Sequence, residues 1–214
     1  MKLIIIVVLV MLPVIINTIT SKVYKKYRNI IYNNIKGIDI VDKIFNKNNI
    51  DIKVSIKNNY YDIYNKILYL DNLEYNGNTI ISLALSAYYA SYAIQDKLNY
   101  NKLRNKLRVL PLLNFLGKIS YIVMLIALII KNSNIFYIGV LMILIDIVYN
   151  LITIDVEKNA QDRAINSLHE IGLNDKDDIL KDIYRITKYY HIKNLLSITN
   201  MIIDKIIKMI DKQG

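Results

Sequence analysis

The chain has 214 residues and a formal net charge of +10, from 28 Lys and Arg against 18 Asp and Glu. Hydrophobic residues make up 54% of it, which is too high for an ordinary soluble protein of this length and predicts that part of the chain lies in a membrane. There is no cysteine, which excludes disulfides and thiolate metal sites. The basic residues cluster beside apolar segments, so they indicate membrane topology, and we expect no nucleic-acid partner.

Three stretches are the most apolar parts of the chain: Leu3–Ile16, Ile119–Ile130 and Ile135–Ile145. A bilayer needs about 20 residues, and the second stretch reaches that length if it extends back to Val109, the third if it extends on to Ile154. We therefore expect an N-terminal membrane anchor over residues 1–21 and a transmembrane helical hairpin over residues 109–154.

The first stretch also has a second interpretation, a cleaved signal peptide, because Lys2 is followed by a short apolar run. The segment Asn17–Ser21 offers no Ala-x-Ala cleavage site, which favours an uncleaved anchor. By the positive-inside rule, the basic clusters Lys22–Arg28 and Lys97–Arg108 place the main soluble segment, 22–108, in the cytoplasm. The expected location is the cytoplasmic membrane, with several passes and the lipid bilayer as a partner.

The soluble segment 22–108 is expected to be an α/β segment. Asp39–Asn46 has apolar residues at helical spacing, and Gly37 marks the start of that helix. Ile50–Ile56 alternates apolar and polar residues, and Lys66–Leu70 is a second run typical of a strand. Residues 58–64 would join the two strands as a loop or hairpin.

A turn is predicted at Asn76–Asn78, after which Asn78 or Thr79 would cap a long helix through Leu98. The C-terminal segment, 155–214, is expected to be helical. Its first helix would run from Val156 to Ile171 and end at Gly172. The sequence thus predicts an α+β membrane protein, mainly helical, with a small β-hairpin or sheet.

Two further helices are expected after Gly172. Asn174 or Asp175 would cap the first, which has apolar residues on one face and would continue towards His191. The second, from Ile192 on, has an amphipathic pattern, so it should lie on the membrane surface or against the rest of the protein.

Residues 86–95 of the long helix are Ser-Ala-Tyr-Tyr-Ala-Ser-Tyr-Ala-Ile-Gln. Tyr88 and Tyr92 share one helical face with Leu85, and aromatic residues in this arrangement usually pack in a core. A ligand pocket lined by tyrosines is the alternative.

Together, residues 77–95 and 153–163 resemble the bacterial membrane-bound neutral zinc metallopeptidases, and the resemblance runs from about Tyr27 to Met201. The residues that match those flanking the HExxH motif of this family are Ala87, Ala93, Ile94 and Gln95. Those that match its second motif, which supplies the third zinc ligand, are Val156, Glu157, Asn159, Ala160, Arg163 and Ala164. The resemblance implies an N-terminal anchor, a small α/β segment and a zinc-binding helix.

By position, the two zinc-binding histidines of the family fall on Tyr88 and Tyr92, the catalytic base on Tyr89, and the third ligand on Glu157. A phenol has a pKa near 10, so at neutral pH it is a poor zinc ligand and a weak base. Glu157 remains, but one carboxylate does not hold catalytic zinc. We expect no catalytic residue, no bound metal and no cofactor, where the family uses zinc.

The chain has two histidines, His169 and His191. Both follow the tyrosine helix by many residues, and at about 1.5 Å per residue His169 would lie some 18 Å along its helix from Glu157. We expect neither to rebuild a metal site and both to be exposed. Glu157 is expected to have a structural role, hydrogen-bonded to a tyrosine hydroxyl or to Arg163.

Three functions stay open on the sequence. The preferred one is a non-catalytic pseudoprotease of the membrane that binds peptides or membrane-protein partners. The alternatives are an active membrane zinc metallopeptidase with a non-standard site and a structural membrane protein. Metal content separates the first two, and co-purification of a defined partner separates the first from the third.

Overall fold

A computed structural model describes residues 2–32, 34–173 and 177–195. These residues form two compact units. The apolar unit consists of residues 2–20, 106–154 and 192–195, and the site unit consists of the described part of residues 21–105 and 155–191.

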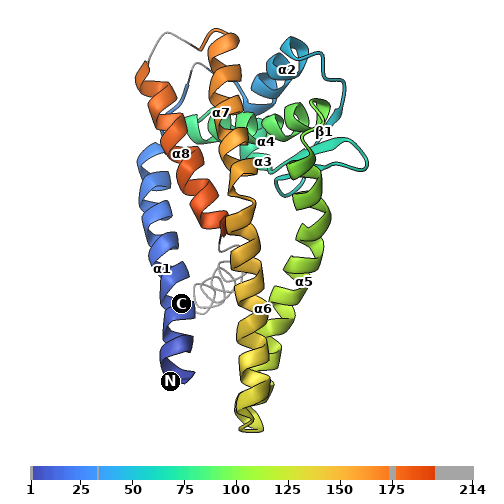
Figure 1. Ribbon diagram of the computed structural model, residues 1–214. Coiled ribbons are helices and arrows are strands. Elements are labelled where there is room, and N and C mark those ends of the chain that lie inside the picture. Colours follow the sequence, from blue (N-terminus) through green and yellow to red (C-terminus); the bar gives the residue numbers. More distant parts are fainter. Residues whose placement is uncertain (1, 33, 174–176, 196–214) are drawn as a thin grey trace. The chain divides into compact units, whose positions relative to one another are not determined.

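The apolar unit contains most of three helices, α1 (Lys2–Tyr27), α5 (Asn101–Ile129) and α6 (Ser133–Ile152). Figure 1 shows α5 and α6 running side by side as a hairpin. The core between them is made of Met124, Ala127, Phe136, Val140 and Ile143. A side chain at Gly139 would overlap Met124, so this glycine lets the two helices approach closely.

Two helices, α5 and α6, are long and apolar enough to cross a membrane. Many of their large apolar side chains are exposed, among them Leu125, Ile129 and Leu141, as expected of a surface that contacts lipid. This agrees with the predicted hairpin. This count covers the described residues, which leave out the side chains of residues 2–10 of α1, so the N-terminal anchor stays a prediction.

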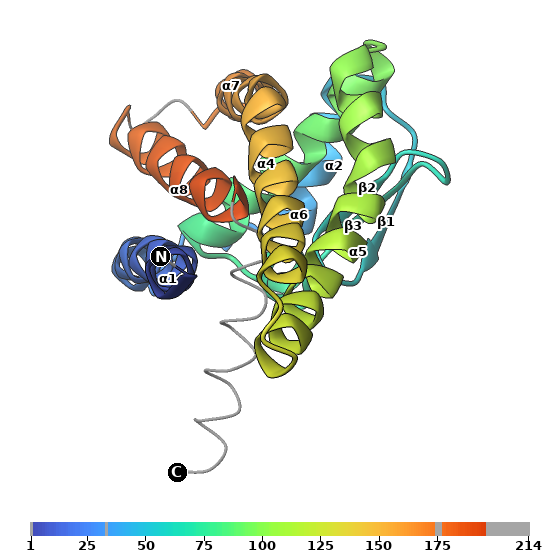
Figure 2. The ribbon, with the colours of Figure 1, turned by 60° about the horizontal axis from the view of Figure 1, so that its bottom comes forward.

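The site unit contains a three-stranded sheet of β1 (Lys53–Ile56), β2 (Tyr60–Asp62) and β3 (Ile67–Leu70), in the order β1-β3-β2. These strands lie side by side in Figure 2. Strand β1 pairs with β3 in parallel, and β2 pairs with β3 antiparallel. A loop or hairpin joining β1 to β3 was therefore the wrong connection, because the connecting segment supplies a strand of its own.

The turn between β2 and β3 explains this topology. The Oδ1 atom of Asp62 accepts hydrogen bonds from the backbone N–H groups of Tyr64 and Asn65, at 3.0 and 2.9 Å. Lys66 then adopts a positive φ of 51°. Such an Asx turn reverses the chain within a few residues, and it folds β2 back onto β3.

Helices α2 (Gly37–Lys47), α3 (Asn72–Asn76) and α4 (Ile80–Lys97) complete the first part of the site unit. The predicted helices α2 and α4 are confirmed, and Thr79 caps α4 by accepting a hydrogen bond from the N–H group of Ser82. The sequence analysis did not predict α3. Almost every side chain of α4 is buried, which is why this helix is apolar on all sides.

Helices α7 (Ile154–Glu170) and α8 (Asp177–Leu195) form the second part of the site unit, apart from their outermost residues. Gly172 has the left-handed φ of 86° expected after a helix end, which confirms the predicted stop. The predicted caps at Asn174 or Asp175 and the final amphipathic helix beyond Leu195 lie outside the described residues.

Candidate functional site

Two phenols and one carboxylate form the centre of the candidate site. Tyr88 and Tyr92 stand one turn apart on α4, and Glu157 stands in the first turn of α7. Both hydroxyl groups donate to the same atom, Glu157 Oε2, with an oxygen–oxygen distance of 2.6 Å from Tyr92. The expected hydrogen bond from a phenol to Glu157 is therefore confirmed. Only 5% of the surface of Glu157 is exposed, so these bonds stabilise a buried carboxylate.

Two more tyrosines close the site on one side. The hydroxyl groups of Tyr89 and Tyr190 lie 2.6 Å apart, so Tyr89 pairs with α8 and not with Glu157. The ring centroids of Tyr88, Tyr89, Tyr92 and Tyr190 are 5.6 to 6.0 Å from their neighbours in edge-to-face contacts. We call these four residues the tyrosine cluster. Such contacts are typical of a packed aromatic core.

His191 lies in this site, although the sequence analysis predicted an exposed side chain. It is 6% exposed, and its Nδ1 atom is 3.9 Å from Glu157 Oε2. The prediction was wrong because it relied on the large number of residues between His191 and the tyrosine helix. In the structure, α8 folds back beside α4 and α7. A signal was present: Ile183, Thr187 and His191 recur every four residues, and the first two are fully buried.

The other predictions for this region have mixed outcomes. His169 is exposed, as expected. Arg163 donates to Asn159 Oδ1 at 2.7 Å, which differs from the expected alternative partner Glu157. Gln95 donates to the carbonyl oxygen of Val156 and to Asn159 Oδ1, at 2.9 and 3.0 Å. Gln95 and Asn159 thus fasten α4 to α7 beside Glu157.

Burial and charge keep the phenols protonated. Burial, followed by the charge of Glu157, raises the pKa of both Tyr88 and Tyr92 well above the ordinary value. For Tyr89, burial and then Tyr190 raise the pKa in the same direction. At physiological pH Tyr88, Tyr89 and Tyr92 are therefore neutral, and none of them can act as a general base.

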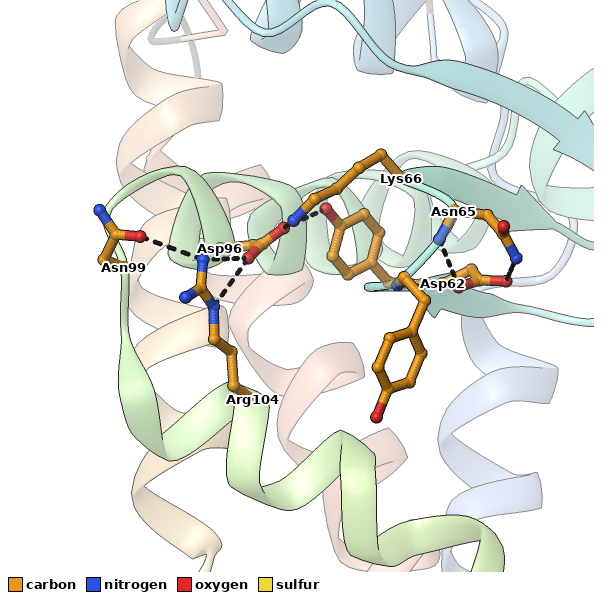
Figure 3. A network of polar contacts seen from close by, with 8 residues as sticks. Asp62, Asn65, Lys66, Asp96, Asn99 and Arg104 are labelled. Carbon is orange, nitrogen blue, oxygen red and sulfur yellow. Dashed lines mark hydrogen bonds and ion pairs between the residues drawn. The ribbon is translucent and has the colours of Figure 1, made fainter.

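A second buried carboxylate, Asp96, fixes the end of α4 that follows the tyrosine cluster (Figure 3). Asp96 accepts hydrogen bonds from Tyr61 at 2.7 Å, from Lys66, and from Arg104 at 3.3 Å. Burial raises the pKa of Asp96, but the hydrogen bonds from Lys66 and Tyr61 outweigh it and hold the pKa below its usual range. No local pattern in the sequence indicates this network, because its hydrogen bonds join residues that are up to 35 positions apart.

The comparisons with known proteins agree with the resemblance seen in the sequence. The model of a family described as "Putative neutral zinc metallopeptidase" matches residues 2–199. The "Putative membrane protease YugP" of Bacillus subtilis (strain 168) is 24% identical over 105 residues, which are 49% of this chain and 47% of that protein. The chain thus spans about half the length of this curated relative. No solved structure matches the chain.

Proposed function

Because this chain belongs to the neutral zinc metallopeptidase family, we propose that it is a membrane pseudoprotease, which binds peptides or membrane-protein segments without cleaving them. One observation supports this proposal above all. At the positions that the resemblance assigns to two zinc ligands, Tyr88 and Tyr92 donate hydrogen bonds to Glu157, the residue in the position of the third.

The residues present do not fit the zinc ion that the family implies. Catalytic zinc takes three protein ligands such as imidazole and carboxylate. Here two of the three positions hold neutral, buried phenols, and their protons point at the remaining carboxylate. Among the residues that the structure describes, no three His, Cys, Asp or Glu side chains gather into a group that could hold a metal.

A peptide could still bind to the sheet. Strands β1 and β2 are its outer strands, and each leaves one edge of backbone N–H and C=O groups without a neighbouring strand in the described sheet. An extended peptide can add to such an edge through main-chain hydrogen bonds, which requires no catalytic group. Of the two edges, we propose β1, which is the longer strand and ends at the exposed Ile56.

Metal analysis of the purified full-length protein tests whether zinc binding and proteolysis have been lost. We expect no stoichiometric zinc and no proteolysis that a chelator stops. The matched control is the variant Tyr88→His, Tyr89→Glu, Tyr92→His, which restores the ligand set with Glu157 and is expected to gain one zinc per chain. One zinc per unaltered chain, with activity lost on chelation, would contradict the proposal.

A photo-crosslinking residue tests the binding. Ile56 and Leu98 are similarly exposed, at 51% and 57%, but only Ile56 lies on the sheet. We expect a crosslinker at position 56 to capture one defined peptide or membrane protein in cells, and a crosslinker at position 98 to capture none of it. Equal capture at both positions, or none, would favour a structural role.

A second candidate function, an active metallopeptidase with a non-standard site, has one observation in its favour. His191 lies beside Glu157, so a carboxylate and an imidazole meet in the site. Two such ligands are fewer than a catalytic zinc requires, and a phenolate would have to supply the third. The metal analysis decides between this candidate and the pseudoprotease.

For location we propose a multi-pass protein of the cytoplasmic membrane with residues 22–108 in the cytoplasm. The apolar helices α5 and α6 and the basic residues that flank them support this topology. The chain has no cysteine, so single cysteines at Lys102 and Asn132 give a direct test. An impermeant thiol reagent added to intact cells should label position 132 only, and labelling of position 102 would contradict the orientation.

A further inference from the structure

The site unit contains a cavity of about 500 Å³ whose lining includes no member of the tyrosine cluster. It lies between residues 21–28, at the end of α1, and the segment from α3 to the start of α4. Tyr24, Lys25 and Arg28 line it on one side, Glu74 and Thr79 on the other. Its volume falls within the range of about 300 to 1,000 Å³ that is usual for small-ligand sites.

Two of the residues that line this cavity each hold a buried polar atom that has no hydrogen-bond partner among the described residues. These atoms are the hydroxyl oxygen of Tyr24 and the Oε2 atom of Glu74, and neither is accessible to solvent. Glu74 is only 9% exposed. An unsatisfied buried polar atom costs about 1 to 3 kcal/mol, so two such atoms beside one cavity need an explanation. The last torsion of a glutamate is broad, which lets Oε2 turn toward a donor inside the cavity.

The charged residues that line the cavity indicate which kind of ligand it binds. Lys25 and Arg28 are exposed and bring two positive charges to the cavity, and a guanidinium beside an ammonium suits a phosphate. Glu74 brings an acidic group to the same space, and a carboxyl oxygen there calls for a hydrogen-bond donor on the ligand. From this pairing of basic side chains with a buried carboxyl group we propose that the cavity binds a phosphate group that carries an amine, as in phosphoethanolamine, either free or as a phospholipid head group.

The order of residues along α1 favours the phospholipid as the source. The cavity residues Ser21–Arg28 follow directly after the apolar stretch of α1. If this stretch is a membrane anchor, which is part of the proposed function, its basic end lies at the level of the lipid head groups. The amine then selects phosphatidylethanolamine over anionic lipids that have no amine.

Binding of short-chain, water-soluble lipids to the full-length protein in detergent tests this inference by calorimetry. We expect dihexanoyl phosphatidylethanolamine to bind more tightly than dihexanoyl phosphatidic acid, which has no amine. Arg28→Gln should weaken the binding of both lipids about tenfold, because it removes a charge-assisted contact with the phosphate. Glu74→Gln should abolish the preference for the amine and leave the binding of phosphatidic acid unchanged.

Lys22→Gln is the matched control, because Lys22 is an exposed basic residue near the end of α1 that does not line the cavity. If the changes at Lys22 and Arg28 weaken lipid binding equally, the attraction is unspecific and the inference is wrong. The inference is also wrong if neither lipid binds, or if the lipid with the amine does not bind more tightly. Competition by free phosphoethanolamine at similar affinity would assign the site to the soluble compound, whereas binding of the lipid alone would assign it to the membrane. None of these outcomes depends on zinc content, so failure here is separate from failure of the pseudoprotease proposal.

Discussion

Removing the two phenol hydroxyl groups tests whether they stabilise the buried carboxylate of the site. Tyr92→Phe deletes a donor 2.6 Å from Glu157 Oε2, and a hydrogen bond to a charged group contributes about 1.5 to 3 kcal/mol. The double variant Tyr88→Phe, Tyr92→Phe removes both donors to that atom. Because Glu157 is 5% exposed, we expect the double variant to lose about 3 to 5 kcal/mol, as when a buried charge loses a partner.

Thermal unfolding of the full-length chain in detergent, followed by circular dichroism, measures these effects. For a chain of this size about 1 kcal/mol corresponds to 2 to 4 °C in Tm, so the single variant should have a Tm several degrees lower than the unaltered protein, and the double variant should lose about twice as much. Adding Glu157→Gln to the double variant should recover much of the loss, since no buried charge then needs the donors. This rescue is the non-additivity expected of groups in direct contact.

Tyr89→Phe is the control, because it removes a buried tyrosine hydroxyl group that does not donate to Glu157. Its hydroxyl pairs with Tyr190 at 2.6 Å, so it should cost only about 0.5 to 1.5 kcal/mol and show no coupling to Glu157→Gln. If the double phenylalanine variant lies within about 0.5 kcal/mol of the unaltered protein, a surface-like value, or if Glu157→Gln fails to rescue it, the carboxylate does not depend on these phenols.

Three further changes address the rest of the site unit. Burial is the largest cause that raises the pKa of Glu74 to about 7, followed by the hydrogen bond to Asp71 and the charge of Asp71. The contribution of Glu74 to stability is therefore complete below pH 4.5 and lost as the pH rises through 7. Glu74→Gln should raise the free energy of unfolding at pH 8, by about 3 kcal/mol at most, and not at pH 4, whereas parallel pH curves of the two proteins would contradict this. Gly37→Ala would place a methyl group against the carbonyl oxygen of Glu74 and should lower stability by about 1 to 3 kcal/mol in the same unfolding assay. Asp96→Asn should lower the free energy of unfolding by about 2 kcal/mol, because it weakens the hydrogen bond from Tyr61. Because the pKa of Asp96 is lowered in the folded protein, the difference in stability between the two proteins should be largest at neutral pH and vanish as the pH falls well below 4.

The helices could be predicted from the sequence because their signals are local. The capping Thr79 and the helix-ending Gly172 mark their boundaries within a few residues, and both assignments are confirmed. The strand β2 could not be found in this way, because three residues are too few to show an alternation. The parallel pairing of β1 with β3 is equally invisible, since it depends on where β2 inserts.

In the candidate site, too, some contacts could be predicted from the sequence and others could not. The juxtaposition of Tyr88 and Tyr92 with Glu157 could be predicted, because the resemblance to a family fixes which helix faces meet. His191 could not, since the family motif says nothing about α8, and the distance along the chain argued against contact. The acceptor role of Asp96 depends on side chains from three separate elements, and no local pattern indicates it.

The spacing of the tyrosines explains how helices α4 and α7 can stay joined at this site without histidines at positions 88 and 92. Positions i and i+4 of a helix point the same way, which brings two imidazoles to one ion in an HExxH helix. The same spacing brings the hydroxyl groups of Tyr88 and Tyr92 to one oxygen atom of Glu157. An apolar residue at either position would remove one donor to that buried carboxylate, at a cost of about 1.5 to 3 kcal/mol, which is a considerable share of the roughly 5 to 15 kcal/mol by which a domain is stable. Selection for folding alone therefore suffices to keep two phenols opposite Glu157, with no need for selection on peptidase activity.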